Sequence, residues 1–417
     1  MIARVLLVLF VLLLFGILES PDSTESGSGI QQAIWTLTYV VSILGLYVER
    51  RRAWPLIRNS WPIVALIGLI VVSSVWSDYH AISLKRALEL VGTSASAYFI
   101  AVHFKLFEFL EGWVAATATA AVASLSLILA VPSRGVMQDA YAGAWQGIFV
   151  HKNSLGQAMA FGIITILIVA FAKDRAQRRN RLLVGAALLC CVLLLGSASV
   201  TSYLIFAVLA LAPLMFWMSQ SVRARRALPW MIVFGIVAAL CIGLNFDTFI
   251  NLLGRDSSLT GRTDLWTSVM EAIGKRPLLG YGYGTFWLPD GTGSAYLSTL
   301  LDWTPYHAHN GVLELLLDVG FVGTGLFLFV LAFGLWRAWK FAWGQHDITR
   351  LWPLVAMIYF IAGNITEANI AKYNEMNWVI FLVAFLFVSQ PLTAKAPSIR
   401  VNERLDTRPQ RREAVLR

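Results

Sequence analysis

Two short polar segments carry side chains that suit the transfer of a group away from a phosphate. Arg255 and Arg262 lie seven residues apart around a glycine-containing turn. Arginine guanidiniums can bind phosphate oxygens through paired, charge-assisted hydrogen bonds. Further along the chain His309 precedes Asn310, and a neutral imidazole can accept or orient a hydroxyl proton near pH 7. These residue types indicate phosphate binding and general-base chemistry.

Each segment also has a purely structural interpretation. Arg255 and Arg262 could reach lipid phosphates at a membrane surface, or pair with Asp256 and Asp264. His309 could be an interfacial residue at a polar helix start. The residues alone leave both interpretations open.

A third polar segment consists of His151, Lys152 and Asn153. Glu314 and Asp318 are four residues apart and so share one helix face. A face exposed to solvent or paired with arginine is favoured over a pair of catalytic carboxylates. The other unusual polar groups are Arg86, Lys275, Arg276, His307, Glu367 and Lys372.

The composition shows which elements must position these groups. Apolar residues make up 58% of the 417 residues and charged residues only 14%, which excludes a water-soluble globule. One membrane span needs about 20 apolar residues, so the chain could supply about twelve transmembrane helices. The three cysteines lie in apolar runs and suggest neither disulfides nor a cysteine metal site.

The apolar runs predict a polytopic all-α membrane protein with about twelve spans. The predicted spans are about 1–18, 30–48, 60–76, 87–103, 112–131, 155–172, 182–199, 201–218, 229–246, 320–339, 351–366 and 376–391. The domains that follow are 1–246 with helices 1–9, an extracytoplasmic loop domain at 247–310, 311–391 with helices 10–12, and a basic, disordered tail at 392–417. Within the loop, a helix is expected to start near Thr260 and to stop at Gly274 and Pro277.

The distribution of basic residues predicts the orientation of these spans. Of the 33 lysines and arginines, 24 fall on one side of the predicted membrane and nine on the other. The positive-inside rule then places both termini in the cytoplasm, and the basic tail needs no nucleic-acid partner. The polar segments described above lie outside, where cytosolic nucleotides are absent. A substrate activated and delivered in the membrane, such as a lipid diphosphate, fits this placement.

Four stretches of the chain resemble one known family. His309-Asn310 followed after nine residues by Gly320, and after two more by Gly323-Thr324, looks like the outer-loop signature of the O-antigen ligase and polymerase superfamily. Further likenesses are Gly261-Arg262 with Leu265-Trp266, the stretch 277–282, and the stretch 147–156, which resembles the exopolysaccharide-polymerase branch. One departure is Val200, where many relatives carry a basic residue.

The resemblance implies a bacterial inner-membrane glycosyltransferase similar to the metal-independent, inverting C-type enzymes. Such enzymes move a glycan from a polyprenyl diphosphate, usually undecaprenyl diphosphate, to a sugar hydroxyl at the outer face, without a cofactor. The implied catalytic residues are His309, as base or orienting group, and Arg262, at the diphosphate. The implied substrate-binding residues are Arg255, Lys152, His151, Asn153, Asn310 and Glu314. A flippase and a chain-length regulator are implied as further partners.

Several functions remain open at this point. A polymerase would extend a lipid-linked repeat unit, whereas a ligase would move the glycan onto the lipid A core; the 147–156 stretch favours the polymerase. A lipid-linked glycan flippase should line its spans with cations, and this chain keeps them outside. A non-catalytic subunit of an export complex is a further alternative. Finally, Tyr281, Tyr283, Phe286 and Trp287 could stack on sugar rings or form an interfacial aromatic belt.

Overall fold

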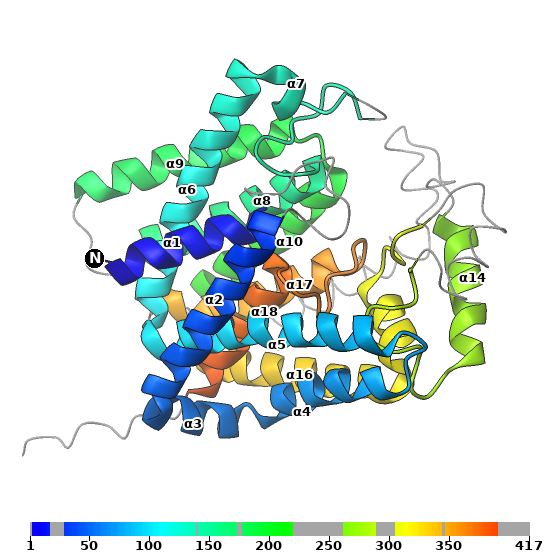
Figure 1. Ribbon diagram of the computed structural model, residues 1–417. Coiled ribbons are helices and arrows are strands. Elements are labelled where there is room, and N and C mark those ends of the chain that lie inside the picture. The colour runs from blue at the N-terminus through cyan, green and yellow to red at the C-terminus, as the bar shows by residue number, and fades with distance from the viewer. Residues whose placement is uncertain are drawn as a thin grey trace, which may run out of the picture.

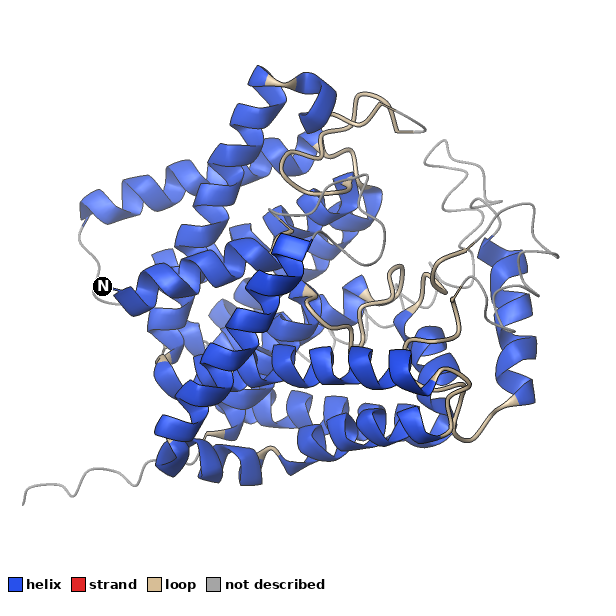
Figure 2. Ribbon diagram, in the orientation of Figure 1, coloured by secondary structure: helices blue, strands red, loops and turns tan. Residues whose placement is uncertain are grey.

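The computed structural model describes residues 2–16, 29–138, 141–172, 177–219, 262–288, 305–343 and 347–390. Within these ranges every regular element is a helix, and the only β feature is an isolated bridge between Val136 and Trp145 (Figures 1 and 2). The all-α prediction is therefore confirmed for this part of the chain.

The helices of the amino-terminal half are α1 (Ile2–Leu14), α2 (Gly29–Val48), α3 (Arg50–Asn59), α4 (Trp61–Val72), η1 (Ser73–Val75), α5 (His80–His103), α6 (Leu106–Ala130), α7 (Pro132–Gly135), α8 (Lys152–Ala170), α9 (Gln177–Gly196) and α10 (Val200–Ser219). Those that follow are α14 (Arg262–Lys275), α16 (Gly311–Ala342), η3 (Ile348–Leu351), α17 (Trp352–Gly363) and α18 (Met376–Ser389). The expected helix in the long loop is confirmed as α14.

Eleven of the predicted spans coincide with helices, and the twelfth, 229–246, lies outside the described residues. Among the described helices, four are long and apolar enough to cross a membrane. A fifth span results if α3 and α4, which are bent by 85°, count as one, and five further apolar helices are 10–17 residues long. The structure thus supports a membrane protein, while the number twelve stays a prediction.

The packing of the helices follows their composition. Side chains of α8 and α18 are buried nearly all around, as expected for helices that are apolar on every face. Large aromatic side chains fill the centre, including Trp113, Phe161 and Tyr359. Helices α4, α5 and α16 lie side by side, and α14 runs across their ends (Figure 1).

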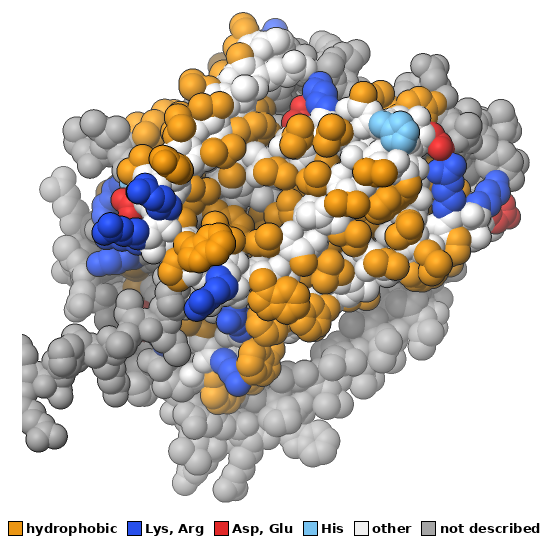
Figure 3. All heavy atoms as spheres, turned by 60° about the horizontal axis from the view of Figure 1, so that its bottom comes forward, with side chains coloured by type: hydrophobic (Ala, Val, Ile, Leu, Met, Phe, Trp, Pro, Cys, Tyr) orange, Lys and Arg blue, Asp and Glu red, His pale blue; other side chains and the backbone are white. Residues whose placement is uncertain are grey.

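One broad face of the molecule is covered by hydrophobic side chains, with lysines and arginines gathered at its margins (Figure 3). Exposed side chains such as Leu84, Leu88 and Phe329 are 42%, 55% and 46% accessible. Soluble monomers rarely expose continuous apolar areas of this kind. The face therefore has the character of a lipid-contacting surface.

Helix α16 is broken at Gly320, which adopts φ 62° and ψ −164°. At the break, residues 277–282, hereafter the docked segment, bond to the α16 backbone. The N–H groups of Phe321 and Val322 donate to the carbonyls of Pro277 and Leu278 at 2.8 and 3.1 Å. The break therefore leaves these amides satisfied rather than orphaned.

The docked segment also donates back to α16. The N–H of Tyr281 donates to the Leu317 carbonyl at 2.7 Å, and that of Gly282 to the Asp318 carbonyl at 3.0 Å. Hydrogen bonds thus run in both directions across the break. They fix the start of α16, and with it the His309 segment, relative to the loop that carries α14.

Gly320→Ala is expected to destabilise the protein. The combination of φ 62° and ψ −164° is open essentially only to glycine and costs another residue roughly 1–3 kcal/mol, and an added Cβ would overlap the carbonyl of Leu278. Gly325→Ala is the matched control on the same helix, because an added Cβ there meets no atom within 4 Å. Thermal unfolding in detergent should give a lower midpoint for Gly320→Ala and an unchanged or higher one for Gly325→Ala. Equal midpoints would show that the break is not required.

Candidate active site

The His309 segment is held in place by the start of α16. Asn310 is the N-cap residue, and its Oδ1 accepts the N–H groups of Val312 and Leu313 at 3.0 and 3.1 Å. The N–H of Gly311 donates to the Asn364 carbonyl at 2.9 Å, which ties this start to the loop after α17. The predicted helix start after His309 is thus confirmed, with Asn310 in a capping position.

His309 itself adopts a strained, left-handed backbone with φ 51°. Its N–H donates to Nδ1 of His307 at 3.1 Å, and the two ring centroids are 4.0 Å apart. Non-glycine residues in this conformation are uncommon and tend to gather at functional sites. The strain here brings the two imidazoles together.

Glu367 completes a group that we call the His/Glu cluster: His307, His309 and Glu367. One nitrogen of each ring and a carboxylate oxygen all lie within 4.8 Å of one another, and the three residues are half-buried. In the sequence Glu367 is one of the unusual polar groups, and no local pattern gives it a role. It lies 58 residues after His309 with no recognisable motif around it.

The second polar segment reaches the same place through Asn153. Asn153 Nδ2 donates to Glu367 Oε1 at 3.4 Å, while Asn153 Oδ1 accepts the hydroxyl of Ser199 at 2.9 Å. His151 is the N-cap of α8, and its Nδ1 accepts the Asn153 N–H at 3.2 Å. The structure therefore joins the His151–Asn153 segment to the His309 segment, although more than 150 residues separate them.

Lys152 is buried, with 4% of its surface accessible. Its Nζ donates to the Ala198 carbonyl at 3.1 Å and lies 4.5 Å from the centroid of the Tyr141 ring. Ala198 lies two residues before Val200, which is the first residue of α10. Lys152 thus brings a cation from a different helix close to this position.

The arginine segment is described only in part. Arg255 lies outside the described residues, and Arg262 is described as the first residue of α14 without its side chain. Trp266, one turn further along α14, donates its Nε1 hydrogen to the Ala308 carbonyl at 2.9 Å. This bond places the first turns of α14 beside the loop that carries His307 and His309.

The two carboxylates on the first turns of α16 accept hydrogen bonds from backbone N–H groups of other segments. A carboxylate oxygen of Glu314 accepts the Ala308 N–H at 2.8 Å, and Oδ1 of Asp318 accepts the Gly284 N–H at 2.8 Å. Arg86 donates to the carbonyl of the same Gly284. With 6% of its surface accessible, Asp318 is buried, so the favoured solvated face is wrong for this residue. The carboxylate accepts a hydrogen bond from a backbone amide, which a sequence pattern cannot reveal, and the charge of Arg86 also acts on it, in keeping with the arginine-paired alternative.

The aromatic run at 281–287, which begins inside the docked segment, is buried as well. Tyr281, Tyr283, Phe286 and Trp287 are at most 9% accessible, so the sugar-stacking and interfacial-belt interpretations are both wrong for their rings. Three of them pack with Leu265 and other apolar side chains of α14. They hold α14 in place because large aromatic surfaces dominate the packing of such small clusters.

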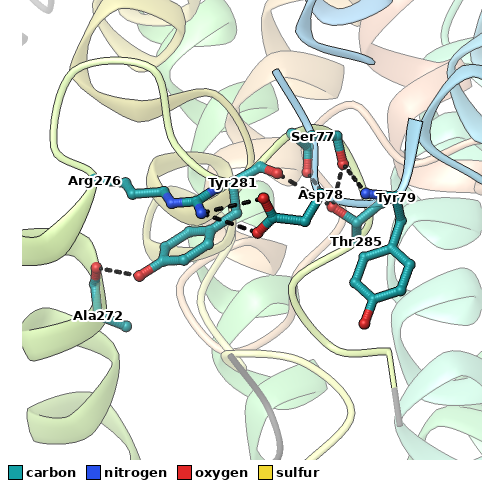
Figure 4. Close-up of polar contacts among 8 residues, drawn as sticks. Ser77, Asp78, Tyr79, Ala272, Arg276, Tyr281 and Thr285 are labelled. Carbon is teal, nitrogen blue, oxygen red and sulfur yellow. Dashed lines mark hydrogen bonds and ion pairs between the residues drawn. The ribbon is translucent and has the colours of Figure 1, made fainter. Parts of the chain in front are cut away.

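Polar contacts fix the other end of α14 (Figure 4). Arg276 Nη2 lies 2.9 Å from a carboxylate oxygen of Asp78, and its guanidinium carbon lies 4.8 Å from the Tyr281 ring centroid. The Tyr281 hydroxyl donates to the Ala272 carbonyl at 2.8 Å. Burial raises the pKa of Tyr281, so the phenol remains a donor at neutral pH. Helix α14 is thus held at both ends.

Comparisons with known proteins find a match over the same part of the chain. Residues 185–328 match the family model described as O-Antigen ligase, and this region contains both the start of α14 and the His309 segment. The match agrees with the resemblance seen in the sequence: residues 185–328 are similar to the O-antigen ligase family.

A particular relative is the exopolysaccharide production protein ExoQ of Rhizobium meliloti (strain 1021). It is 28% identical over 272 residues, which cover 62% of this chain and 61% of the relative. The aligned part therefore spans less than two thirds of that protein.

Proposed function

We propose that the protein transfers a glycan from a polyprenyl diphosphate, of the undecaprenyl class, to the hydroxyl of a second glycan. The observation that carries this proposal is the meeting of His309 with Glu367 and Asn153, beside the first turns of α14, which starts at Arg262. A half-buried imidazole beside a carboxylate suits a general base. A nearby arginine suits a diphosphate leaving group.

The proposed reaction is a single displacement. The acceptor oxygen forms a bond to the anomeric carbon while the bond from that carbon to the diphosphate oxygen breaks, which inverts the configuration. The diphosphate leaves with the bonding electrons, and Arg262 with Arg255 and Lys152 compensates its growing charge. The hydroxyl proton passes to His309, and the carboxylate of Glu367 stabilises the imidazolium that results.

Within this class we propose a polymerase. The relative's name refers to exopolysaccharide production, and the His151–Asn153 segment contacts Glu367 directly. His151, Asn153, Asn310 and Glu314 are then substrate-site residues that bind sugar or shape the site. A flippase that supplies the lipid-linked repeat and a chain-length regulator are its proposed partners.

Deleting the gene and analysing the envelope glycans tests this function. A polymerase predicts the loss of long polymer, with single repeat units retained on the lipid carrier. Full-length polymer stranded on the carrier would instead establish a ligase that acts on a lipid A core. Unchanged glycans would contradict both.

We propose an inner-membrane location with both termini in the cytoplasm, twelve spans, and residues 247–310 forming the outer loop domain between the helical parts 1–246 and 311–391. Contacts among described segments support the grouping of the connections on two opposite sides. On the proposed outer side Trp76 donates to the Leu279 carbonyl at 2.9 Å. On the proposed cytoplasmic side Arg337 donates to the Asn59 carbonyl at 3.0 Å.

Single-cysteine labelling tests the sidedness. Met270→Cys on α14 and Trp54→Cys on α3 replace side chains that are 55% and 67% accessible, in a background that lacks Cys190, Cys191 and Cys241. An impermeant thiol reagent should label Met270→Cys in intact spheroplasts and Trp54→Cys only after permeabilisation. The reverse pattern would invert the topology.

The transfer is expected to need no metal ion, because arginines supply the positive charge at the leaving group. Purified protein given a lipid-diphosphate donor should keep its turnover in excess chelator. A control reaction with a Mg²⁺-dependent glycosyltransferase should stop under the same conditions. Loss of turnover that Mg²⁺ restores would contradict the mechanism.

A further inference from the structure

The His/Glu cluster has a second chemical property besides the base catalysis proposed for His309 with Glu367. Two imidazoles and one carboxylate are a ligand set typical of Zn²⁺ and related transition-metal ions. Across the described residues, this is the group of His, Cys, Asp and Glu side chains whose ligand atoms come close enough to share an ion. Three protein ligands also leave a fourth position for water or a substrate oxygen.

The backbone that carries the cluster is well fixed. Besides the Gly311 N–H bond to Asn364, Asn310 Nδ2 donates to the Ile365 carbonyl at 3.5 Å. The Asn369 N–H donates to Asn364 Oδ1 at 2.8 Å, which closes the loop that carries Glu367. The two ligand-bearing loops are therefore bonded to each other next to the cluster, and the loop that carries Glu367 is also closed on itself. Ligands on fixed backbone favour metal binding because less chain must be ordered.

The same geometry limits the affinity. Metal-ligand bonds of about 2.0–2.1 Å place the ligand atoms of a tetrahedral site roughly 3.4 Å apart. In the cluster they lie up to 4.8 Å apart, so the side chains must move inward. In addition, His307 Nδ1 accepts the His309 N–H at 3.1 Å. A neutral imidazole bound to a metal through one nitrogen carries its proton on the other, so coordination must rearrange this bond.

We propose that His307, His309 and Glu367 reversibly bind a divalent transition-metal ion of the Zn²⁺ class and that the bound ion inhibits the transferase. The cost of closing the cluster makes this a regulatory site and not a resident cofactor site. Inhibition follows because the ion takes the His309 lone pair that would accept the hydroxyl proton. Metal binding is independent of the proposed function, whereas the inhibition rests on it.

The binding part is tested on purified full-length protein without a polyhistidine tag. Zn²⁺ titration calorimetry and the visible absorption of tetrahedral Co²⁺ should each report one site. His307→Ala and Glu367→Gln should weaken binding at least about 100-fold, since even changes in outer partners of a metal site weaken it about 10–100-fold. His103→Ala, at the end of α5 and in ring contact with Phe99, is the matched histidine control and should bind normally.

The inhibition part uses the His307→Ala variant. It should keep most of its turnover without metal, and a Zn²⁺ concentration that halves wild-type turnover should leave it unaffected. Adding chelator should restore the full turnover of the Zn²⁺-inhibited wild-type protein. One-site binding without any transferase activity would support the metal site while overturning the proposed function.

Three outcomes would overturn the proposal. The first is the absence of saturable Zn²⁺ and Co²⁺ binding. The second is binding that survives in both the His307→Ala and Glu367→Gln variants, which would locate the ion elsewhere. The third is turnover that chelator abolishes and Zn²⁺ restores, since the ion would then be a cofactor and not an inhibitor.

Discussion

His309→Ala should lower turnover by about 10²–10⁴-fold, the usual contribution of a general base. The imidazole lies within 4.8 Å of the Glu367 carboxylate, which can stabilise its charged form, and alanine removes the proton acceptor without disturbing the Asn310 cap. The left-handed φ of 51° disfavours alanine, so the midpoint of thermal unfolding must be measured alongside turnover. Steady-state transfer from a purified lipid-diphosphate donor provides the measurement.

His307→Ala is the matched control, two residues away and in ring contact with His309. It should cost much less turnover, because its Nδ1 accepts a backbone N–H and its role is to support the loop. His309→Gly, which relieves the strain at φ 51°, separates chemistry from folding. A fully active His309→Gly protein would remove His309 from the mechanism.

Arg262→Lys should lose most of the activity, on the order of 10²–10³-fold, although the charge is kept. A point ammonium cannot reproduce the paired hydrogen bonds of a guanidinium, and losing one donor to a developing negative charge typically costs this much. The loss should fall on turnover more than on donor binding, because the charge to be compensated grows in the transition state. Single-turnover and binding measurements with the same donor distinguish a loss of turnover from a loss of donor binding.

Lys275→Arg, at the far end of α14, is the matched control, since the helix places it roughly 20 Å from Arg262. It should retain normal turnover. Arg255→Lys should be milder than Arg262→Lys. Near-normal turnover of a well-folded Arg262→Lys protein would return Arg262 to a structural or lipid-binding role.

The sequence predicted the helices well because apolar runs and capping signals act locally. The start of α14 near Thr260 and the helix after Asn310 are both found where the pattern placed them. Helix α5 begins at His80, earlier than the apolar run near 87, because its first turns are polar but still helical. A hydropathy pattern detects the apolar part of a helix that can lie in the membrane, and it does not detect polar turns that extend the same helix.

The site was predicted less completely, because it depends on contacts that are distant in sequence. His309 and Asn153 could be nominated from their own segments. Nothing local indicated that Glu367 would join them, or that Asp318 would be buried against the amide of Gly284. The aromatic run at 281–287 was misassigned for the same reason: composition identifies stacking surfaces but does not tell whether they face a ligand or the core.

The docked segment, residues 277–282, has a consequence for how such proteins can diversify. It fills the break in α16 with backbone hydrogen bonds, and these need a fixed number of residues, with glycine at 280 and 282, where φ is positive and an added Cβ would overlap neighbouring atoms. Insertions or deletions within it would leave amides unpaired at the edge of the membrane, where replacement by water is restricted. Changes in loop length are therefore confined to its flanks. The spacing between the α14 segment and the His309 helix is thereby held constant in three dimensions.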